Sequence, residues 1–214
     1  KFYETASDEG LIDYDDTVQY PFGYGLSYTS FDQKMGDVKY DAKSGKISFD
    51  VTVTNTGSKS GKDVVEVYYN PPYTNGGIEK ATANLVDFEK TKELKPGESQ
   101  TVKVEFDDDD MASYDYQKAK AYVLEKGDYA ISIRSDSHHV IDSKDVTVKD
   151  TITYDSKSNT HNGDKTVATN QFDDAAGVSV PCRPLRELQG SHRRSGQPQN
   201  VRQGEGNLHQ QWQL

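Results

Sequence analysis

Apolar and polar residues alternate along the sequence from Asp37 to Lys149, and a period of two residues is the pattern of β-strands with one buried face. The clearest run covers residues 47–54, where the apolar positions are Ile47, Phe49, Val51 and Val53. Turn-forming sequences such as Asn55-Thr56-Gly57 and Pro96-Gly97 separate these runs. No helical period is present in this range, so this part of the chain is restricted to short strands.

The alternation predicts about seven or eight strands joined by frequent turns. Strands are expected at residues 38–41, 47–54, 64–69, 85–88, 102–106, 119–124, 129–133 and 140–148. Residues 64–69 form a nearly continuous apolar run, which is typical of a central strand packed on both sides. The expected fold class is therefore all-β, an immunoglobulin-like β-sandwich with irregular N- and C-terminal extensions.

A different kind of segment precedes the strands. Residues 20–31, YPFGYGLSYTSF, contain five aromatic rings, two glycines and a proline. Pro21 fixes its own φ and holds Tyr20 extended, whereas Gly23 and Gly25 permit turns or a close approach of the backbone. The segment cannot be a helix and is too aromatic to remain loose in water. We expect a junction strap that crosses between two domains and is held in place by its rings.

The junction strap closely resembles the segment that closes the α/β-sandwich domain of glycoside hydrolase family three enzymes, which include β-glucosidases and β-xylosidases, and enters their fibronectin type III-like domain. The resemblance continues in the order of that domain, through DVVEVYYNPP, NLVDFEKTKELKPGESQTVKVEF, MASYD and KGDYAISIRSDS. It covers roughly residues 1–150. It implies that residues 1–32 are the end of the preceding α/β-sandwich domain with the junction strap, and that residues 33–150 are a fibronectin type III-like β-sandwich.

Two further segments follow the expected sandwich. Residues 151–177 are polar and read as a linker, and TNQFDDAAG resembles the run by which some family members continue to a catalytic barrel placed after the sandwich. Residues 178–214 differ in composition, with five arginines, no lysine, no tyrosine and seven glutamines. This shift indicates out-of-frame or vector-derived residues, and a natural arginine- and glutamine-rich tail is the alternative.

Charge and composition limit the partners. The formal net charge of −10 argues against nucleic acid or an anionic membrane, because both require clustered cations. No apolar run is long enough to span a bilayer. A neutral carbohydrate is compatible with this charge, and no cofactor is expected.

The resemblance also bears on catalysis. Retaining glycosidases use two carboxylates about 5–5.5 Å apart, one as nucleophile and one as acid/base. The family takes its nucleophile from the barrel and its acid/base from the α/β-sandwich domain, and no residue here matches either motif. We therefore predict no catalytic residue in this chain and no activity of the chain alone. No G-x-S-x-G nucleophile elbow occurs either.

Two clusters could be taken for metal sites. Asp107–Asp110 offer hard oxygen ligands, but four consecutive acids point in different directions, so a solvated turn is expected. His138 and His139 are adjacent, and neighbours along a strand face opposite sides. They are expected to be surface or loop histidines, and no metal site is predicted.

The aromatic residues carry the binding hypotheses. The junction strap provides the domain-junction candidates Tyr20, Phe22, Tyr24, Tyr28 and Phe31, whose rings could pack against neighbouring domains or stack on sugars. A second cluster, in the run YYNPPYTNGG, provides the carbohydrate-binding candidates Tyr69, Tyr73 and Asn75. Core packing and loop filling are the alternative roles for this second cluster.

Together these features predict an accessory domain that supports the catalytic domains of a β-glucosidase acting on terminal non-reducing β-D-glucosyl residues. One alternative is a carbohydrate-binding module that contacts polymeric glucan or xylan, and another is a fragment with hydrolase activity of its own. The expected partners are the catalytic domains, with an oligo- or polysaccharide as a further candidate. Without a neighbouring domain, the junction strap is expected to fold back on the β-sandwich or to cover its rings by self-association.

Overall fold

The computed structural model describes residues 10–169. Expectations for residues 1–9, for the last part of the linker at residues 170–177 and for the tail at residues 178–214 fall outside the described residues. The described part is a β-sandwich with very short helices, which confirms the all-β prediction. Within it, no helix has the length and apolar composition needed to cross a membrane.

The first sheet is built around the longest strand, β3 (Lys46–Asn55). β6 (Ser99–Asp107) pairs along the whole of β3 on one side. Two shorter strands, β1 (Phe31–Met35) and β2 (Lys39–Asp41), pair with successive parts of β3 on the other side. All of these pairings are antiparallel, and a tight turn joins β2 to β3.

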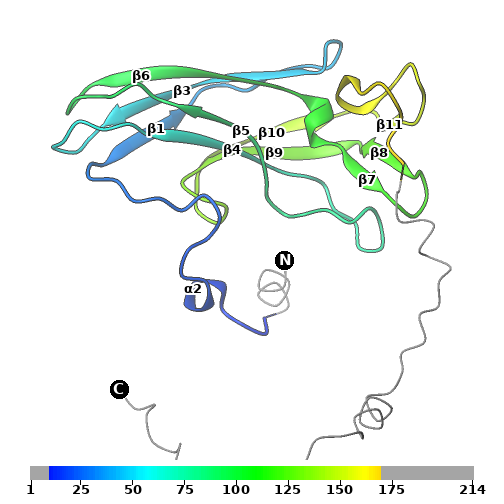
Figure 1. Cartoon of the computed structure of the whole chain (residues 1–214), viewed down its shortest axis with the longest axis horizontal. Helices are drawn as coiled ribbons and strands as arrows, with labels where there is room; N and C mark the ends of the chain where they lie inside the picture. Colours follow the sequence, from blue (N-terminus) through cyan, green and yellow to red (C-terminus); the bar gives the residue numbers. More distant parts are fainter. Residues whose placement is uncertain (1–9, 170–214) are drawn as a thin grey trace, which may run out of the picture. The chain divides into compact units, whose positions relative to one another are not determined.

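The second sheet has the order β10-β9-β4-β5 (Figure 1). Its strands are β4 (Val64–Asn70), β5 (Asn84–Lys90), β9 (Gly127–Arg134) and β10 (Val140–Val148). β4 lies between β9 and β5, so the sequence prediction of a central strand is confirmed. A small third sheet has the order β11-β8-β7, from β7 (Ser113–Asp115), β8 (Ala121–Leu124) and β11 (Ile152–Tyr154).

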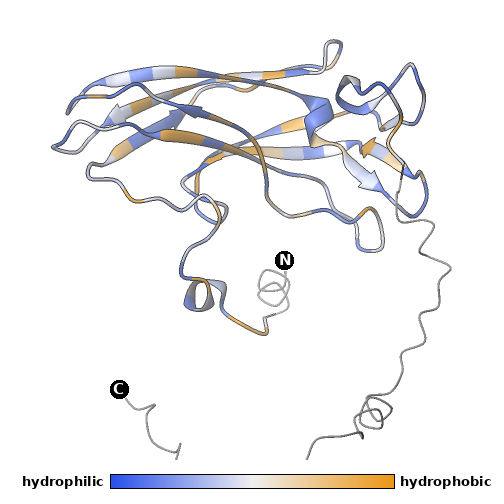
Figure 2. Cartoon of the chain, in the orientation of Figure 1, coloured by the Kyte–Doolittle hydropathy of each residue, from blue (hydrophilic) through white to orange (hydrophobic). Residues whose placement is uncertain are grey.

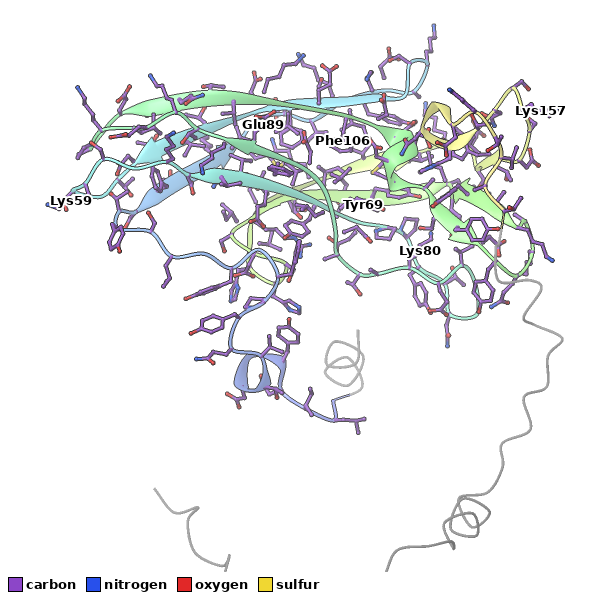
Figure 3. All side chains as sticks on the ribbon, viewed as in Figure 1. Lys59, Tyr69, Lys80, Glu89, Phe106 and Lys157 are labelled. Atoms are coloured by element: carbon purple, nitrogen blue, oxygen red, sulfur yellow. The ribbon has the colours of Figure 1, made fainter. Side chains whose placement is uncertain are left out.

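The core fills the space between the two large sheets. Every second residue of β3 is buried, as the period of two requires, and the same alternation of apolar and polar residues is visible along β6 in Figure 2. Phe106 of the first sheet and Tyr69 of the second both belong to this core (Figure 3). The main core side chains are Ile47, Phe49, Val51, Val53, Val65, Val67, Val102, Val104, Tyr129, Ile131 and Ile133.

Three strands were not predicted from the sequence. β1 contains the last residue assigned to the junction strap, and β7 is only three residues long. β11 lies in the segment expected to be a linker, where it pairs with β8 from Ile152 to Tyr154. These strands are short, and β1 and β11 also depend on partner strands that are not their neighbours in sequence.

The acidic run at residues 107–110 is also more ordered than the expected solvated turn. It includes a 3₁₀ helix, η1 (Asp108–Met111), and Asp108 is buried where it accepts a 2.7 Å hydrogen bond from the hydroxyl of Tyr40. Asp109 accepts a hydrogen bond from the N–H of Asn162 in η2 (His161–Gly163), and His161 stacks on Tyr122 at 3.9 Å. Residues 161–163, beyond β11, are therefore held against the sandwich.

The outer face of the first sheet is polar throughout. Thr52 is hydrogen-bonded to Thr101, and Thr54 to Ser99, across the β3–β6 pair. Ion pairs join Lys46 to Asp107 and Lys103 to Glu105 on the same face. Polar pairs of this kind, across or along the strands, are typical of a sheet surface that faces water.

Burial of β9 predicts a large effect for one substitution. Ile133 is fully buried in the core, so Ile133→Ala should lower the free energy of unfolding by about 2–5 kcal/mol. The same change at Ile141, which is 42% exposed in the neighbouring strand β10, should cost about 1 kcal/mol or less. Urea unfolding followed by circular dichroism measures both values, and equal losses would contradict this assignment of the core.

The buried phenol of Tyr69 predicts a loss of stability in alkali. Burial, with a smaller effect of the Asp110 carboxylate, raises the pKa of Tyr69 to about 12, above the ordinary value of about 10. Between these values the unfolded chain releases the phenolic proton and the folded chain keeps it. The free energy of unfolding should therefore fall as pH rises from about 10 to about 12.

Tyr69→Phe removes this proton, so urea unfolding at a series of pH values should show a smaller alkaline loss than in the unmodified chain. Part of the loss should remain, because burial also raises the pKa of Tyr129 and Tyr154. Tyr73→Phe, at an exposed ring, is the control. Identical alkaline losses for the two variants would show that Tyr69 is not the source.

Candidate functional site: the junction strap on the second sheet

The junction strap (residues 20–31) lies over the outer face of the second sheet, next to the loop that joins β9 to β10 (Figure 1). The N–H of Ser137 in this clasp loop (residues 135–139) donates a 2.8 Å hydrogen bond to the carbonyl of Phe22. Tyr14, in the single-turn helix α2 (Tyr14–Thr17), stacks on His138 with ring centroids 3.6 Å apart. The clasp loop thus holds the strap and the helix that precedes it.

Arg134, at the end of β9, fixes the clasp loop through hydrogen bonds. Its guanidinium is buried and donates hydrogen bonds of 2.8 Å to the hydroxyl of Ser132, 2.7 Å to the carbonyl of Ser137 and 2.5 Å to the side-chain oxygen of Asn70. It also lies 5.3 Å from the centre of the Tyr68 ring, within the range of a cation–π contact. Burial lowers the pKa of Arg134, but a guanidinium remains protonated at any physiological pH.

Asp136 closes the clasp loop on itself. Its carboxylate accepts hydrogen bonds from the N–H groups of His138 and His139, and it lies 2.8 Å from Nδ1 of His139. Burial favours a higher pKa for Asp136, yet these hydrogen bonds outweigh it and leave the pKa below the ordinary value. The loop therefore has a defined conformation in which the Ser137 N–H is available to the strap.

The strap approaches the sheet most closely at Gly23. Gly23 has φ of 86°, and a Cβ on it would lie 2.9 Å from the hydroxyl of Tyr68 and clash with Glu66. Glu66 and Tyr68 lie on the outer face of β4, where the hydroxyl of Tyr68 donates a 2.8 Å hydrogen bond to Glu66. Burial is the main reason why the pKa of both Glu66 and Tyr68 is raised.

The other end of the strap is fixed to the first sheet. The carbonyl of Ser30 accepts hydrogen bonds from the N–H groups of Thr56 and Gly57, and the hydroxyl of Thr29 donates to the side-chain oxygen of Asn55. A Cβ on Gly57 would lie 2.6 Å from the backbone nitrogen of Ser30, so only glycine fits there. Both ends of the strap are thus held mainly by its main chain.

The rings of the strap point into solvent. Tyr28 is fully exposed, Leu26 is 88% exposed, and Tyr20, Phe22 and Tyr24 are all exposed. Tyr20 and Tyr24 contact each other at 5.0 Å. Phe31 differs, because it begins β1 and packs partly against the core. The expectation that the rings hold the strap in place is therefore wrong for Tyr20, Phe22, Tyr24 and Tyr28.

Apolar residues of the second sheet extend this exposed surface. Phe88 and Leu85 of β5 lie opposite Glu66 and Tyr68 of β4, and both are exposed. Val140 of β10, opposite Arg134, is exposed on the same face. The outer face of the second sheet therefore carries an exposed apolar patch beside the strap, which the first sheet lacks, and apolar patches rimmed by polar residues are typical of protein contacts.

The three carbohydrate-binding candidates do not form one site. Tyr69 is only 6% exposed, and its ring packs on Tyr129 in the core, so it cannot stack on a sugar. Tyr73 and Asn75 are exposed in the loop of residues 71–83. Lys80, whose side chain is 2% exposed, holds this loop by an ion pair with Glu125 and a hydrogen bond to the carbonyl of Pro72.

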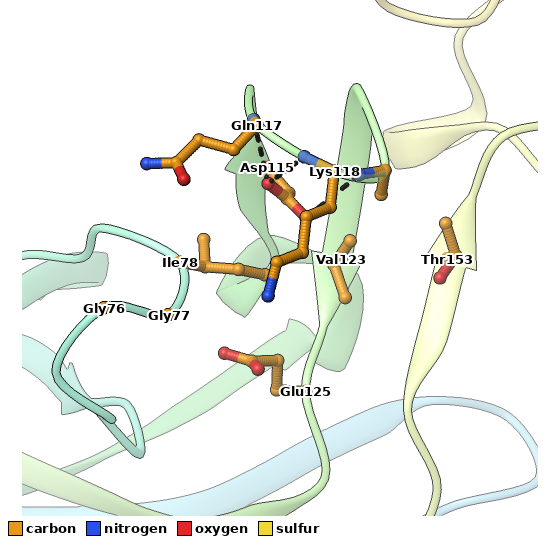
Figure 4. Close-up of a pocket in the computed structure, with 10 residues that line it drawn as sticks. Gly76, Gly77, Ile78, Asp115, Gln117, Lys118, Val123, Glu125 and Thr153 are labelled. Carbon is orange, nitrogen blue, oxygen red and sulfur yellow. Dashed lines mark hydrogen bonds between the residues drawn. The ribbon is translucent and has the colours of Figure 1, made fainter.

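A cleft of about 450 Å³ lies between this loop and the β7–β8 hairpin (Figure 4). Its lining includes the backbone of Gly76 and Gly77, the side chains of Ile78 and Val123, and the polar residues Asp115, Gln117, Lys118, Glu125 and Thr153. Hydrogen bonds from the N–H groups of residues 118, 119 and 117 lower the pKa of Asp115. Glu125 pairs with Lys80, so both carboxylates of the cleft already hold the local structure.

Within residues 10–169, no group of three or more His, Cys, Asp or Glu side chains is arranged to hold a metal ion. The site residues that the sequence analysis missed are Glu66, Arg134 and Ser137. Arg134 had a usable signal, since it is the only arginine before residue 178 and it ends an otherwise apolar strand. A buried arginine in a strand requires hydrogen-bond partners nearby.

Comparison with known proteins identifies the domain. The family described as "Fibronectin type III-like domain" matches residues 63–137. The chain is 36% identical to a β-glucosidase of Kluyveromyces marxianus over 133 residues, which are 62% of this chain and 15% of the relative. It is 44% identical to β-glucosidase A of Butyrivibrio fibrisolvens over 128 residues, 52% of this chain and 15% of the relative.

A solved structure of β-glucosidase 3B from Thermotoga neapolitana, in complex with glucose, superposes with a TM-score of 0.58 at 32% identity. The match covers 64% of this chain and 18% of that one. The chain thus spans no more than about a fifth of the relatives it matches. The β-sandwich described above is a fibronectin type III-like domain of the glycoside hydrolase family three type found in β-glucosidases.

Proposed function

We propose that this chain is the accessory domain of a family-three β-glucosidase and supports the catalytic domains by packing against them through the junction strap. The parent enzyme hydrolyses terminal non-reducing β-D-glucosyl residues, in keeping with the names of the relatives. The chain contributes no catalytic carboxylate. Its role is to provide a fixed surface against which the catalytic domains pack.

The observation that carries this proposal is the arrangement of the strap, with its main chain held at both ends and its rings exposed. A segment fixed in this way loses little further conformational entropy when a partner covers its side chains. Aromatic rings provide large contact areas and are enriched in protein interfaces. The polar outer face of the first sheet offers no comparable surface, so the second sheet is the side that meets the partner.

Strap substitutions in two contexts test this proposal. Leu26→Ala combined with Tyr28→Ala should leave the thermal stability of the 214-residue chain unchanged, because both side chains are exposed in it. In the full-length parent enzyme the same pair should lower the melting temperature, since each apolar side chain buried in the contact is worth about 1.5–3 kcal/mol. Differential scanning calorimetry measures both.

Tyr116→Ala, at an exposed tyrosine on the β7–β8 hairpin, is the control and should affect neither context. An unchanged melting temperature of the full-length double variant would overturn the proposal. So would flanking coding sequence that encodes no glycosidase domain.

A second candidate function is contact with carbohydrate through the loop of residues 71–83. It is favoured by the exposed ring of Tyr73 and by the open cleft beside this loop, whose polar groups suit sugar hydroxyls. Lys80 holds the loop in place, which limits the entropy lost on binding.

Affinity electrophoresis in gels that contain soluble glucan or xylan tests this second function. The unmodified chain should be retarded, and Tyr73→Ala should restore free mobility because it removes the exposed ring. Tyr28→Ala, at an exposed tyrosine of the junction strap, is the control and should stay retarded. Unchanged mobility of the unmodified chain in every gel would remove the binding idea.

A further inference from the structure

A groove of about 370 Å³ lies beneath the junction strap, and its two parts differ in chemistry. Leu26, Phe31, Val64 and Ile141 give it apolar walls. Its polar residues include Gln33 of β1, Asp63, and Glu66 of β4. These three side chains present mostly hydrogen-bond acceptors, so the groove suits an occupant that donates.

The acceptors in this groove are incompletely compensated within the described residues. The side-chain nitrogen of Gln33 donates to Asp63 and to the carbonyl of Val64, which leaves its side-chain oxygen buried without a hydrogen-bond partner. Glu66 receives one hydrogen bond, from Tyr68. A buried acceptor that lacks a donor is costly, so such groups usually have a partner.

The carboxylates of the groove also lack a compensating cation within the described residues. Burial raises the pKa of Glu66, and the nearby carboxylates of Asp136 and Asp63 raise it further. Lys62 also lines the groove, but it is exposed, and neither Asp63 nor Glu66 has an ion pair with it in residues 10–169. Arg134 lies opposite Glu66 in the β4–β9 pair, yet its donors are directed to Ser132, Ser137 and Asn70.

We propose that this groove receives an arginine side chain from the protein surface that docks on the junction strap. Taking that surface to be the catalytic domains rests on the function proposed above, whereas the preference for arginine rests on the groove itself. The guanidinium donates to the Glu66 carboxylate, with the Asp63 carboxylate as a further acceptor. The apolar walls then cover the methylene stem of the arginine.

Arginine suits these acceptors better than lysine or a neutral polyol. Its planar fork offers five donors in fixed directions and can serve several acceptors at once, whereas an ammonium group is a compact and strongly hydrated charge. It is also the cation most enriched in protein interfaces. A sugar would satisfy the hydrogen bonds but would leave the negative charge of Glu66 and Asp63 unbalanced.

An NMR titration of the ¹⁵N-labelled 214-residue chain with N-acetyl-arginine amide tests the groove directly. The amide signals of residues 33, 63 and 66 and the side-chain amide of Gln33 should shift together and saturate, with a Kd on the order of 1–10 mM. N-acetyl-citrulline amide has almost the same shape without the charge. It should bind more weakly by about fivefold, the upper range for a partly exposed ion pair.

Glu66→Gln should weaken arginine binding by a similar factor while keeping an acceptor for the Tyr68 hydroxyl. Asp50→Asn, at an exposed carboxylate on the outer face of the first sheet, is the control and should leave it unchanged. Equal binding of the arginine and citrulline compounds would overturn the proposal. Shifts spread over all exposed carboxylates, or saturation by cellobiose alone, would do the same.

The titration and the calorimetry of strap variants test separate claims, so one claim can be contradicted while the other stands. The titration contains no second domain, so a negative result removes the arginine groove and leaves the docking role of the strap in place. Conversely, an unchanged melting temperature of the full-length strap variant removes the proposed function. A positive titration would then assign the groove to arginine from another protein.

Discussion

The second sheet and the junction strap depend on how one buried cation is satisfied. A guanidinium taken out of water is stable only where hydrogen bonds replace the lost hydration, and Arg134 obtains them from β9, β4 and the clasp loop. Ser137 links this cation to the strap. Its carbonyl accepts a hydrogen bond from Arg134, and its N–H donates one to the carbonyl of Phe22. The desolvation of one side chain is thus coupled to the path of a distant segment.

The two outer faces of the sandwich show how the domain is used. Threonine, serine and ion pairs cover the β3–β6 face, where water is the expected neighbour. Exposed aromatic and aliphatic side chains of the strap and of β5 lie over part of the other face, above polar groups that fix the backbone. Apolar surface drives association, and the polar layer beneath it sets the position of that surface. Polar and main-chain groups therefore fix the position of this surface, and apolar side chains make the contact with a partner.

The sequence was sufficient for the large sheets and insufficient for the strap. Residues such as Ile47, Val51 and Val104 indicate their strands, because a sustained period of two residues is characteristic of a strand with one buried face. The role of Tyr69 stays open in the sequence between sugar stacking and core packing, because local sequence does not reveal which face of a strand meets the core, and the structure places it in the core. The orientation of Tyr28 depends on hydrogen bonds made by Ser30 and Phe22 with residues far along the chain. Contacts of this kind leave no local pattern.

The fixation of the strap through peptide groups has an evolutionary consequence. Nearly all of the contacts that set its path come from carbonyl oxygens, amide hydrogens and the absence of a side chain at Gly23 and Gly57, and these do not specify which rings stand between them. The docking side chains can therefore be substituted as the partner surface changes, without a loss of stability of the fold. Such a segment combines a constant backbone path with exposed side chains that can be exchanged to suit a different partner.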